Sequence, residues 1–158
     1  MTTAEQIIEL FEMKPLVGEG GYYVETYRSG EKTGGGKSLS TAILYLITPE
    51  ACSKLHRLSS DEIWHFYLGD AVTMLQLHAD GSSEVVTLGQ DIRNGQRLQL
   101  AVPANSWQGC FLNEGGKFAL MGCTVWPGFE FEDFEPGERE KLLEKYPEQR
   151  ELILKLTE

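Results

Sequence analysis

The stretch His56–Asp70, HRLSSDEIWHFYLGD, sets a histidine and a glutamate beside a run of aromatic residues. If its second half forms a β-strand, the strand period of two places Glu62, Trp64 and Phe66 on one face. The opposite face then carries Ile63, His65 and Tyr67. A carboxylate among aromatic rings needs a partner, because an unpaired buried charge is costly. We expect that partner to be His56, on the preceding strand.

The region from Gly21 to Val125 consists of short runs rich in β-branched and aromatic residues. Turn sequences such as ADGS, RNGQ and NEGGK separate these runs. The runs predict about eight short strands with no helical pattern between them. This order favours an all-β protein, an antiparallel jelly-roll barrel at residues 20–128, over a parallel α/β sheet.

Helical patterns flank the predicted barrel. Residues 3–13 begin with a capping-box pattern and continue with apolar residues on one face, which predicts a short N-terminal helix. Residues 138–156 place leucines between charges and predict C-terminal helices packed outside the barrel. No internal repeat or linker divides the sequence, so we expect a single domain at residues 1–158.

The formal net charge is -10, and the sequence has no extended basic cluster. Such a chain repels phosphate backbones and anionic lipids, so we expect neither nucleic acid nor membrane partners. The 3 cysteines show no CxxC spacing, which argues against a disulfide framework or a zinc knuckle. Because no export signal or long apolar stretch is visible, we expect a cytoplasmic protein.

The opening stretch resembles the first motif of the cupin superfamily, HxHx(3,4)Ex(6)G. His56, Glu62 and Gly69 fall in register with that motif, whereas Leu58 stands where the motif has its second histidine. The resemblance implies a cupin-type barrel. It also implies that one of the usual metal-binding histidines is missing.

The segment PANSWQGCFL resembles the second cupin motif. Pro103 matches it, Asn105 replaces a glycine, and Gln108 replaces the metal-binding histidine. Asparagine is a mild replacement, because it tolerates a positive φ better than most residues. Glutamine at the position of a metal-binding histidine is a larger change.

Four segments, EGGYYVETYRS, HRLSSDEIWHFYLGD, VPANSWQG and GCTVWPGFEFEDF, resemble a subgroup of small cupins known as a domain of unknown function. The similarity extends from Glu19 to Phe134. It implies a homodimer and a distant similarity to the deoxysugar-nucleotide epimerases, which are cupins that transfer protons without a metal. Because one fold supports many functions, the resemblance predicts the fold better than the activity.

Three functions remain open for this barrel. The first is a metal-independent isomerase or epimerase acting on a sugar nucleotide or another small polar molecule, with His56 as general base and Glu62 beside it. In that enzyme Arg28 and Arg57 would hold a carboxylate or phosphate, helped by Gln108. The candidate acids are Tyr22, Tyr23, Tyr27 and Tyr45.

The second function is a non-catalytic ligand-binding or sensor module, in which Tyr22, Arg57, Trp64 and Gln108 would set the affinity. The third is a metal-dependent cupin enzyme. We expect no cofactor, because a divalent metal would bind only weakly at His56 and Glu62. A structural interpretation also stands, in which His56 and Glu62 form a residual ion pair and Arg57 pairs with Asp61.

Overall fold

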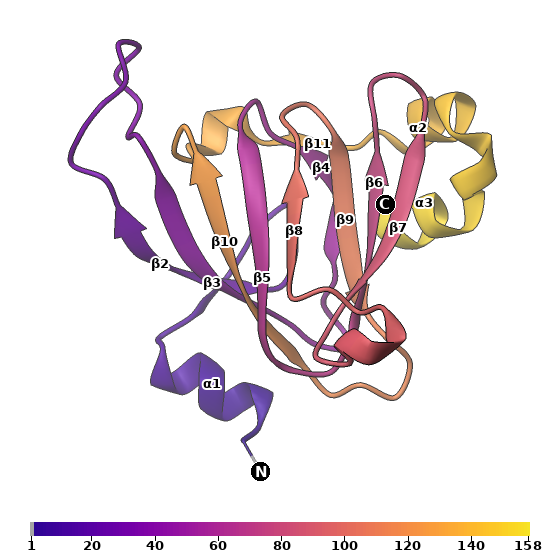
Figure 1. Ribbon diagram of the computed structural model, residues 1–158, viewed down its shortest axis with the longest axis horizontal. Coiled ribbons are helices and arrows are strands. Elements are labelled where there is room, and N and C mark those ends of the chain that lie inside the picture. Colours follow the sequence, from indigo (N-terminus) through magenta and orange to yellow (C-terminus); the bar gives the residue numbers. More distant parts are fainter. Residues whose placement is uncertain (1) are drawn as a thin grey trace.

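Two antiparallel sheets form the body of the protein, whose computed structural model describes residues 2–158 (Figure 1). One sheet has six strands, in the order β1 (Lys14–Pro15), β2 (Tyr22–Arg28), β3 (Thr41–Ile47), β10 (Ala119–Trp126), β5 (Asp61–Gly69) and β8 (Gln99–Val102). The other has five, in the order β11 (Glu135–Pro136), β4 (Ser53–Arg57), β9 (Trp107–Leu112), β6 (Val72–Leu77) and β7 (Ser83–Leu88). This architecture confirms the predicted all-β jelly-roll barrel.

Each run that predicts a strand forms one in the structure. Three further short strands, β1, β4 and β11, complete the sheets. Of these, β4 carries His56 and is the strand that we expect before the aromatic run. The predicted limits of the barrel, 20–128, leave out β1 and β11, because two-residue strands have no detectable period in the sequence.

Helices cover the outside of the barrel at two places. Helix α1 (Ala4–Leu10) starts at a capping box between Thr3 and Gln6 and packs below β2 and β3 (Figure 1). Helices α2 (Arg139–Lys145) and α3 (Arg150–Leu156) pack on the outer face of the five-stranded sheet. Within residues 2–158, no helix is long and apolar enough to cross a membrane.

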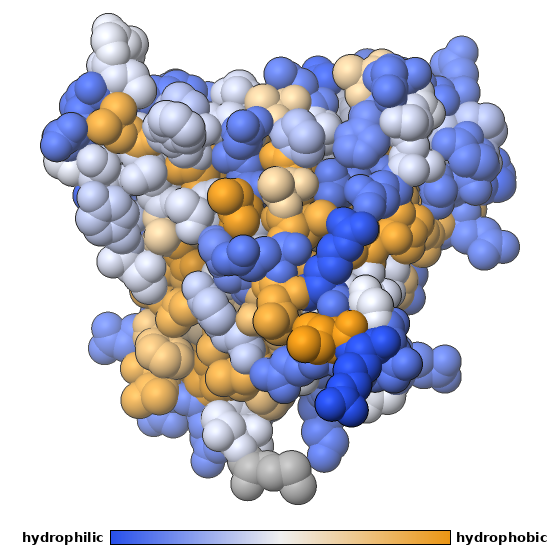
Figure 2. Space-filling model, viewed as in Figure 1, coloured by the Kyte–Doolittle hydropathy of each residue, from blue (hydrophilic) through white to orange (hydrophobic). Residues whose placement is uncertain are grey.

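The side chains of β5 alternate as its sequence predicts. Glu62, Trp64 and Phe66 are buried inside the barrel. The opposite face carries Ile63, His65 and Tyr67, which are half-buried or exposed. On the face shown in Figure 2, hydrophobic residues gather toward the lower left and the middle of the view, and hydrophilic residues surround them. The homodimer stays a prediction.

Candidate functional site

A cavity of about 300 Å³ lies inside the barrel. Strands β2, β3, β4, β5 and β10 contribute to its wall, together with the loop before β2 and residues 127–134, which follow β10 and which we name the mouth loop. Its polar wall residues are Glu19, Tyr23, Glu25, Arg28, Thr41, Tyr45, His56, Glu62 and Glu130. The cavity thus brings together three of the predicted site residues, namely His56, Glu62 and Arg28.

His56 is held with one ring nitrogen bonded and the other unbonded. Its Nδ1 lies 2.8 Å from the carbonyl oxygen of Lys54. Because a carbonyl only accepts, Nδ1 carries the proton of the neutral ring, and Nε2 keeps its lone pair. No hydrogen bond to Nε2 is found within residues 2–158, and its ion-pair contact is Glu19 Oε2 at 3.7 Å. The ring stacks on Phe134, with centroids 5.1 Å apart.

Glu19 is a site residue that the motifs do not identify. It is buried, and its Oε1 accepts a hydrogen bond of 2.6 Å from Ser53 Oγ. The two glycines that follow position it, because a Cβ at Gly20 would lie 2.2 Å from the carbonyl oxygen of Cys52. Gly20 and Gly21 both have positive φ. The sequence EGG is therefore the signal that could have identified this loop.

Glu62 is buried, and its Oε2 accepts a hydrogen bond of 2.6 Å from Gln108 Nε2. Burial raises the pKa of Glu62 from 4.5 to about 7. A protonated His56 opposes this rise in pKa, whereas the carboxylate of Glu19 adds to it. The expected direct pairing of His56 with Glu62 is wrong. The carboxylate nearest to His56 Nε2 is that of Glu19, and Glu62 bonds to Gln108 instead.

A β-bulge in β4 turns His56 into the barrel. Ser53 pairs with Cys110 and His56 with Gln108, so three steps along β4 match two steps along β9. The extra residue changes the alternation and lets Ser53 and His56 both face Glu19. Gly109 lies opposite the bulge, where a Cβ would be 3.0 Å from the backbone of Ser53 and of Leu55. The glycine in WQGCFL therefore permits the bulge.

A second bulge, in β2, turns Arg28 toward the cavity. Glu25 pairs with Ile43, and Tyr27 pairs with Ala42, so Thr26 is the extra residue. Without it, the alternation would place Arg28 on the face opposite Tyr23 and Glu25. With it, Arg28 lies on the same wall as both.

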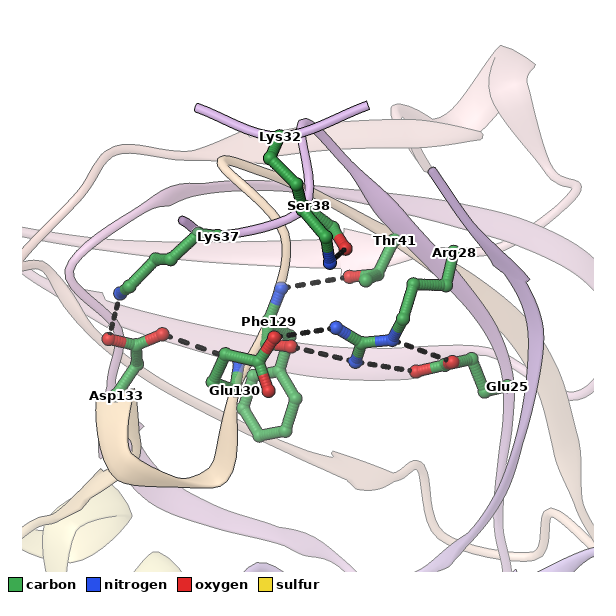
Figure 3. A network of polar contacts seen from close by, with 9 residues as sticks. All are labelled: Glu25, Arg28, Lys32, Lys37, Ser38, Thr41, Phe129, Glu130 and Asp133. Carbon is green, nitrogen blue, oxygen red and sulfur yellow. Dashed lines mark hydrogen bonds and ion pairs between the residues drawn. The ribbon is translucent and has the colours of Figure 1, made fainter. Parts of the chain in front are cut away.

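Arg28 ties the mouth loop to β2, as Figure 3 shows. Its guanidinium donates two hydrogen bonds to the carboxylate of Glu25. It donates one more to Glu130 at 2.6 Å and one to the carbonyl oxygen of Phe129 at 2.9 Å. The Phe129 N–H donates to Thr41, and Lys37 pairs with Asp133 at the far end of the loop. The loop is therefore anchored on both sides of the cavity mouth.

Trp64 and Gln108, which we expected to contact a ligand, lie behind the cavity wall. Both are buried, with 1% of the residue exposed, and neither lines the cavity. Trp64 Nε1 donates to Gln108 Oε1 at 2.7 Å, which directs the amide nitrogen of Gln108 toward Glu62. Gln108 therefore positions Glu62, and Trp64 positions Gln108.

Tyr22 and Arg57 face away from the cavity. Tyr22 packs among the residues that contact α1, because the alternation of β2 gives the inner position to Tyr23. Arg57 follows His56 and points outward, where it pairs with Glu135 and stacks on Trp107. The expected pairing of Arg57 with Asp61 is also wrong, since Asp61 accepts a hydrogen bond from Ala104 N–H.

The four candidate tyrosines are in different surroundings. Tyr45 and Tyr23 line the cavity, whereas Tyr22 packs toward α1 and Tyr27 is exposed. The Tyr45 hydroxyl donates to the Gly20 carbonyl at 2.8 Å, and burial raises the pKa of Tyr45 well above its usual value. Tyr45 is therefore a poor proton donor, and its hydroxyl hydrogen already bonds to the Gly20 carbonyl.

The residues of this cavity do not fit the metal centre that a cupin motif implies. Leu58 lines the wall with an apolar side chain, and Gln108 is bonded to Trp64 and Glu62. Throughout the described chain, no group of three or more His, Cys, Asp or Glu side chains is arranged to hold a metal ion. Asn105, by contrast, takes the positive φ of 66° for which asparagine is suited.

The comparisons with known proteins agree with this architecture. The family model described as Cupin superfamily (DUF985) matches residues 5–136. The uncharacterized protein YML079W of Saccharomyces cerevisiae is 32% identical over 142 residues, which cover 77% of this chain and 70% of that protein.

Two solved structures are similar over almost their whole length. Protein SO0799 from Shewanella oneidensis has a TM-score of 0.93 and 35% identity, with 100% of this chain and 99% of that chain covered. A hypothetical protein from Leishmania major has a TM-score of 0.91 and 32% identity, with 99% of each chain covered.

A more distant structure, the oxalate decarboxylase from Bacillus subtilis, has a TM-score of 0.59 and 15% identity. The match covers 94% of this chain and 38% of that enzyme, and at this identity it supports the fold alone. With the family model matching most of the sequence, the chain belongs to the cupin superfamily, in its DUF985 family.

Proposed function

We propose that the cavity binds a small polar molecule and moves a proton on it without a metal ion, as an isomerase or epimerase does. The observation that carries this proposal is the orientation of His56. Its Nδ1–H is fixed on the Lys54 carbonyl, and its Nε2 lone pair has no hydrogen bond within residues 2–158. A neutral imidazole held this way is a suitable general base.

Glu62 is the proton donor in this proposal. With a pKa of about 7, it carries a proton in roughly half of the molecules at neutral pH. This replaces the tyrosine that we expected as the acid. Gln108 donates a hydrogen bond to its carboxyl group and keeps that group oriented.

The proposed reaction begins on a carbon next to a carbonyl group. His56 Nε2 takes the proton from that carbon, the bonding pair forms a carbon–carbon double bond, and Glu62 protonates the carbonyl oxygen. In an isomerisation, His56 then gives this proton to the neighbouring carbon, while the ionised Glu62 takes a proton from the hydroxyl oxygen that becomes the new carbonyl. Nothing is oxidised or reduced overall, so the step needs no further reactant.

The size and charge of the cavity favour a compact molecule over a sugar nucleotide. A volume of about 300 Å³ lies at the lower end of the range for small-molecule sites, roughly 300–1,000 Å³. A diphosphate would meet four carboxylates in the wall and a single arginine that is already paired. The substrate that we propose is therefore a small hydroxy-aldehyde or hydroxy-ketone.

Proton exchange with solvent tests this proposal. The protein is incubated in D₂O with a panel of small hydroxy-aldehydes and hydroxy-ketones, and ¹H NMR follows the proton next to the carbonyl. We expect at least one compound to exchange. The variants His56→Asn and Glu62→Gln should each slow that exchange by at least about 100-fold.

Both variants preserve local contacts. Asparagine at position 56 keeps an N–H for the Lys54 carbonyl, and glutamine at position 62 keeps an acceptor for Gln108. His65→Asn is the matched control, because His65 points out of the barrel and should leave exchange unchanged. A compound that binds in the cavity without exchange would instead identify a ligand-binding or sensor module.

Elemental analysis of protein purified without a histidine tag tests the metal-free part of the proposal. We expect no stoichiometric transition metal in the wild-type protein. The variant Leu58→His/Gln108→His restores three histidines and one glutamate and should gain metal, which makes it the positive control. A stoichiometric metal in the wild type that is lost in His56→Asn would contradict the proposal.

A further inference from the structure

The cavity wall offers many hydrogen-bond acceptors and few free donors. Four carboxylates face a single arginine, and Arg28 already donates to Glu25, to Glu130 and to the Phe129 carbonyl. The hydroxyl of Tyr45 is bonded to Gly20. Arg28 and the Tyr45 hydroxyl are therefore engaged within the protein and are not free to hold an anion.

The acceptors deep in the cavity are not fully satisfied. Glu19 has Ser53 Oγ on one oxygen, while its other oxygen lies 3.7 Å from His56 Nε2, which is beyond hydrogen-bond distance. The His56 side chain is 2% exposed, and its Nε2 is an acceptor without a donor among residues 2–158. A buried acceptor without a donor is unfavourable, so a ligand that brings N–H groups would supply what the wall lacks.

The mouth of the cavity carries aromatic rings. Phe129 and Phe131 lie there with ring centroids 5.2 Å apart and planes at 77°, and Tyr23 lines the adjacent wall. The electron-rich faces of aromatic rings attract organic cations. The aromatic rings at the entrance and the carboxylates inside the cavity are both complementary to a positively charged ligand.

We infer that the ligand of this cavity is a small organic ammonium compound, whose charged group lies against the carboxylate of Glu19. This inference rests on the proposed function and adds a substrate class to it. The carbonyl compound on which His56 acts would then also carry an amine. Its ammonium group would supply the positive charge that the carboxylates of the cavity wall lack, since Arg28 is already paired with Glu25 and Glu130.

A set of three probes with one shape and different charge tests this inference. Cyclohexylammonium, cyclohexanol and cyclohexanecarboxylate are titrated into the protein by calorimetry at pH 7.5. We expect the ammonium compound to bind at least about tenfold more tightly than the alcohol, and the carboxylate to bind most weakly.

Variants locate the effect. Glu19→Gln should weaken the binding of cyclohexylammonium about tenfold and leave cyclohexanol unchanged. Glu84→Gln is the matched control, because Glu84 pairs with Arg97 on the outside of the barrel. Should Glu19→Gln fail to fold, Glu130→Gln at the mouth serves instead, since it frees one donor of Arg28 and should shift the preference toward the carboxylate.

Tighter binding of the alcohol or the carboxylate would overturn the inference. No binding of cyclohexylammonium at tens of millimolar, or an unchanged affinity in the folded Glu19 variant, would overturn it as well. The proposed function is judged separately, because proton exchange on an uncharged hydroxy-ketone that depends on His56 would keep that function while the charge preference fails.

Discussion

The interior of this barrel has two unlike halves. Around β6, β7 and β9 most inner positions hold apolar side chains such as Met74, Val86 and Leu88. Around β2, β3 and β4 the interior holds the cavity, with Glu19, His56 and Glu62 in its wall. One half is packed for stability, whereas the other buries ionisable groups at a cost in stability. The contrast is typical of a functional site, where activity competes with stability.

Truncating a leucine in each half should expose this difference most strongly. Leu88→Ala removes a fully buried side chain from the packed half and should lower the free energy of unfolding by about 2–5 kcal/mol. Leu58→Ala removes a side chain that already borders the cavity, so its loss should lie at or below the lower end of that range. Urea unfolding at pH 7 measures both. Equal losses would contradict the contrast between the halves.

Neutralising Glu62 should stabilise the protein at high pH. A folded-state pKa of about 7 against an ordinary 4.5 means that the folded protein keeps a proton that the unfolded chain loses. Stability therefore falls as pH rises from 4.5 to 7, by about 3 kcal/mol at 1.36 kcal/mol for each pH unit. Glutamine at position 62 does not ionise, so the Glu62→Gln variant should not lose this stability as the pH rises.

We expect Glu62→Gln to be more stable than the wild type by about 3 kcal/mol at pH 8 and equal to it near pH 4.5. Urea unfolding across this pH range measures the difference. A constant difference at every pH would show that packing, rather than ionisation, separates the two proteins.

Two glutamines offer a matched test of the polar wall. Gln76 and Gln108 are neighbours across β6 and β9, and 1% of each is exposed. Gln108 bonds to Trp64 and Glu62, whereas Gln76 Nε2 has no partner within residues 2–158. Gln108→Met should destabilise the protein by about 1–3 kcal/mol, and Gln76→Met should be neutral or stabilising. The reverse order in thermal unfolding would refute the role of Gln108 in positioning Glu62.

The two arginines that we expected to bind a ligand should differ in binding and hardly in stability. Arg28 and Arg57 each pair with acids at the partly exposed surface, where such pairs contribute about 0–1 kcal/mol. Arg28→Met should nevertheless change the affinity for the ammonium probe, because Arg28 anchors the mouth loop. Arg57→Met should leave that affinity unchanged. Equal effects of the two variants on affinity would argue against the placement of the site.

The alternation of single strands explains how much of this structure the sequence predicts. The pattern in β5 correctly predicts that Glu62 and Trp64 face inward, and the positive φ of Asn105 agrees with its place at the glycine of the second cupin motif. Motif spacing identifies His56 and Glu62, and both line the cavity. These features depend on neighbouring residues in the chain, so a single sequence contains them.

The remaining features depend on contacts between distant segments. Arg28 and His56 face inward because of bulges, and a bulge is defined by pairing with another strand. Glu19 reaches the cavity through a loop whose glycines make room for the backbone of Cys52. Arg57 faces outward to Glu135, 78 residues further along the chain. Periodicity carries no information about such contacts.

The most direct measurement is the titration of Glu62 itself. Protein labelled with ¹³C at the glutamate carboxyl carbons is followed by NMR from pH 4 to 9, and Glu62→Gln assigns the resonance. A group that gives and takes protons at neutral pH should titrate with an apparent midpoint of about 7, and this midpoint should fall in Glu19→Gln. A midpoint near 4.5 would mean that Glu62 is ionised throughout the neutral range, and it would contradict the role of Glu62 as proton donor.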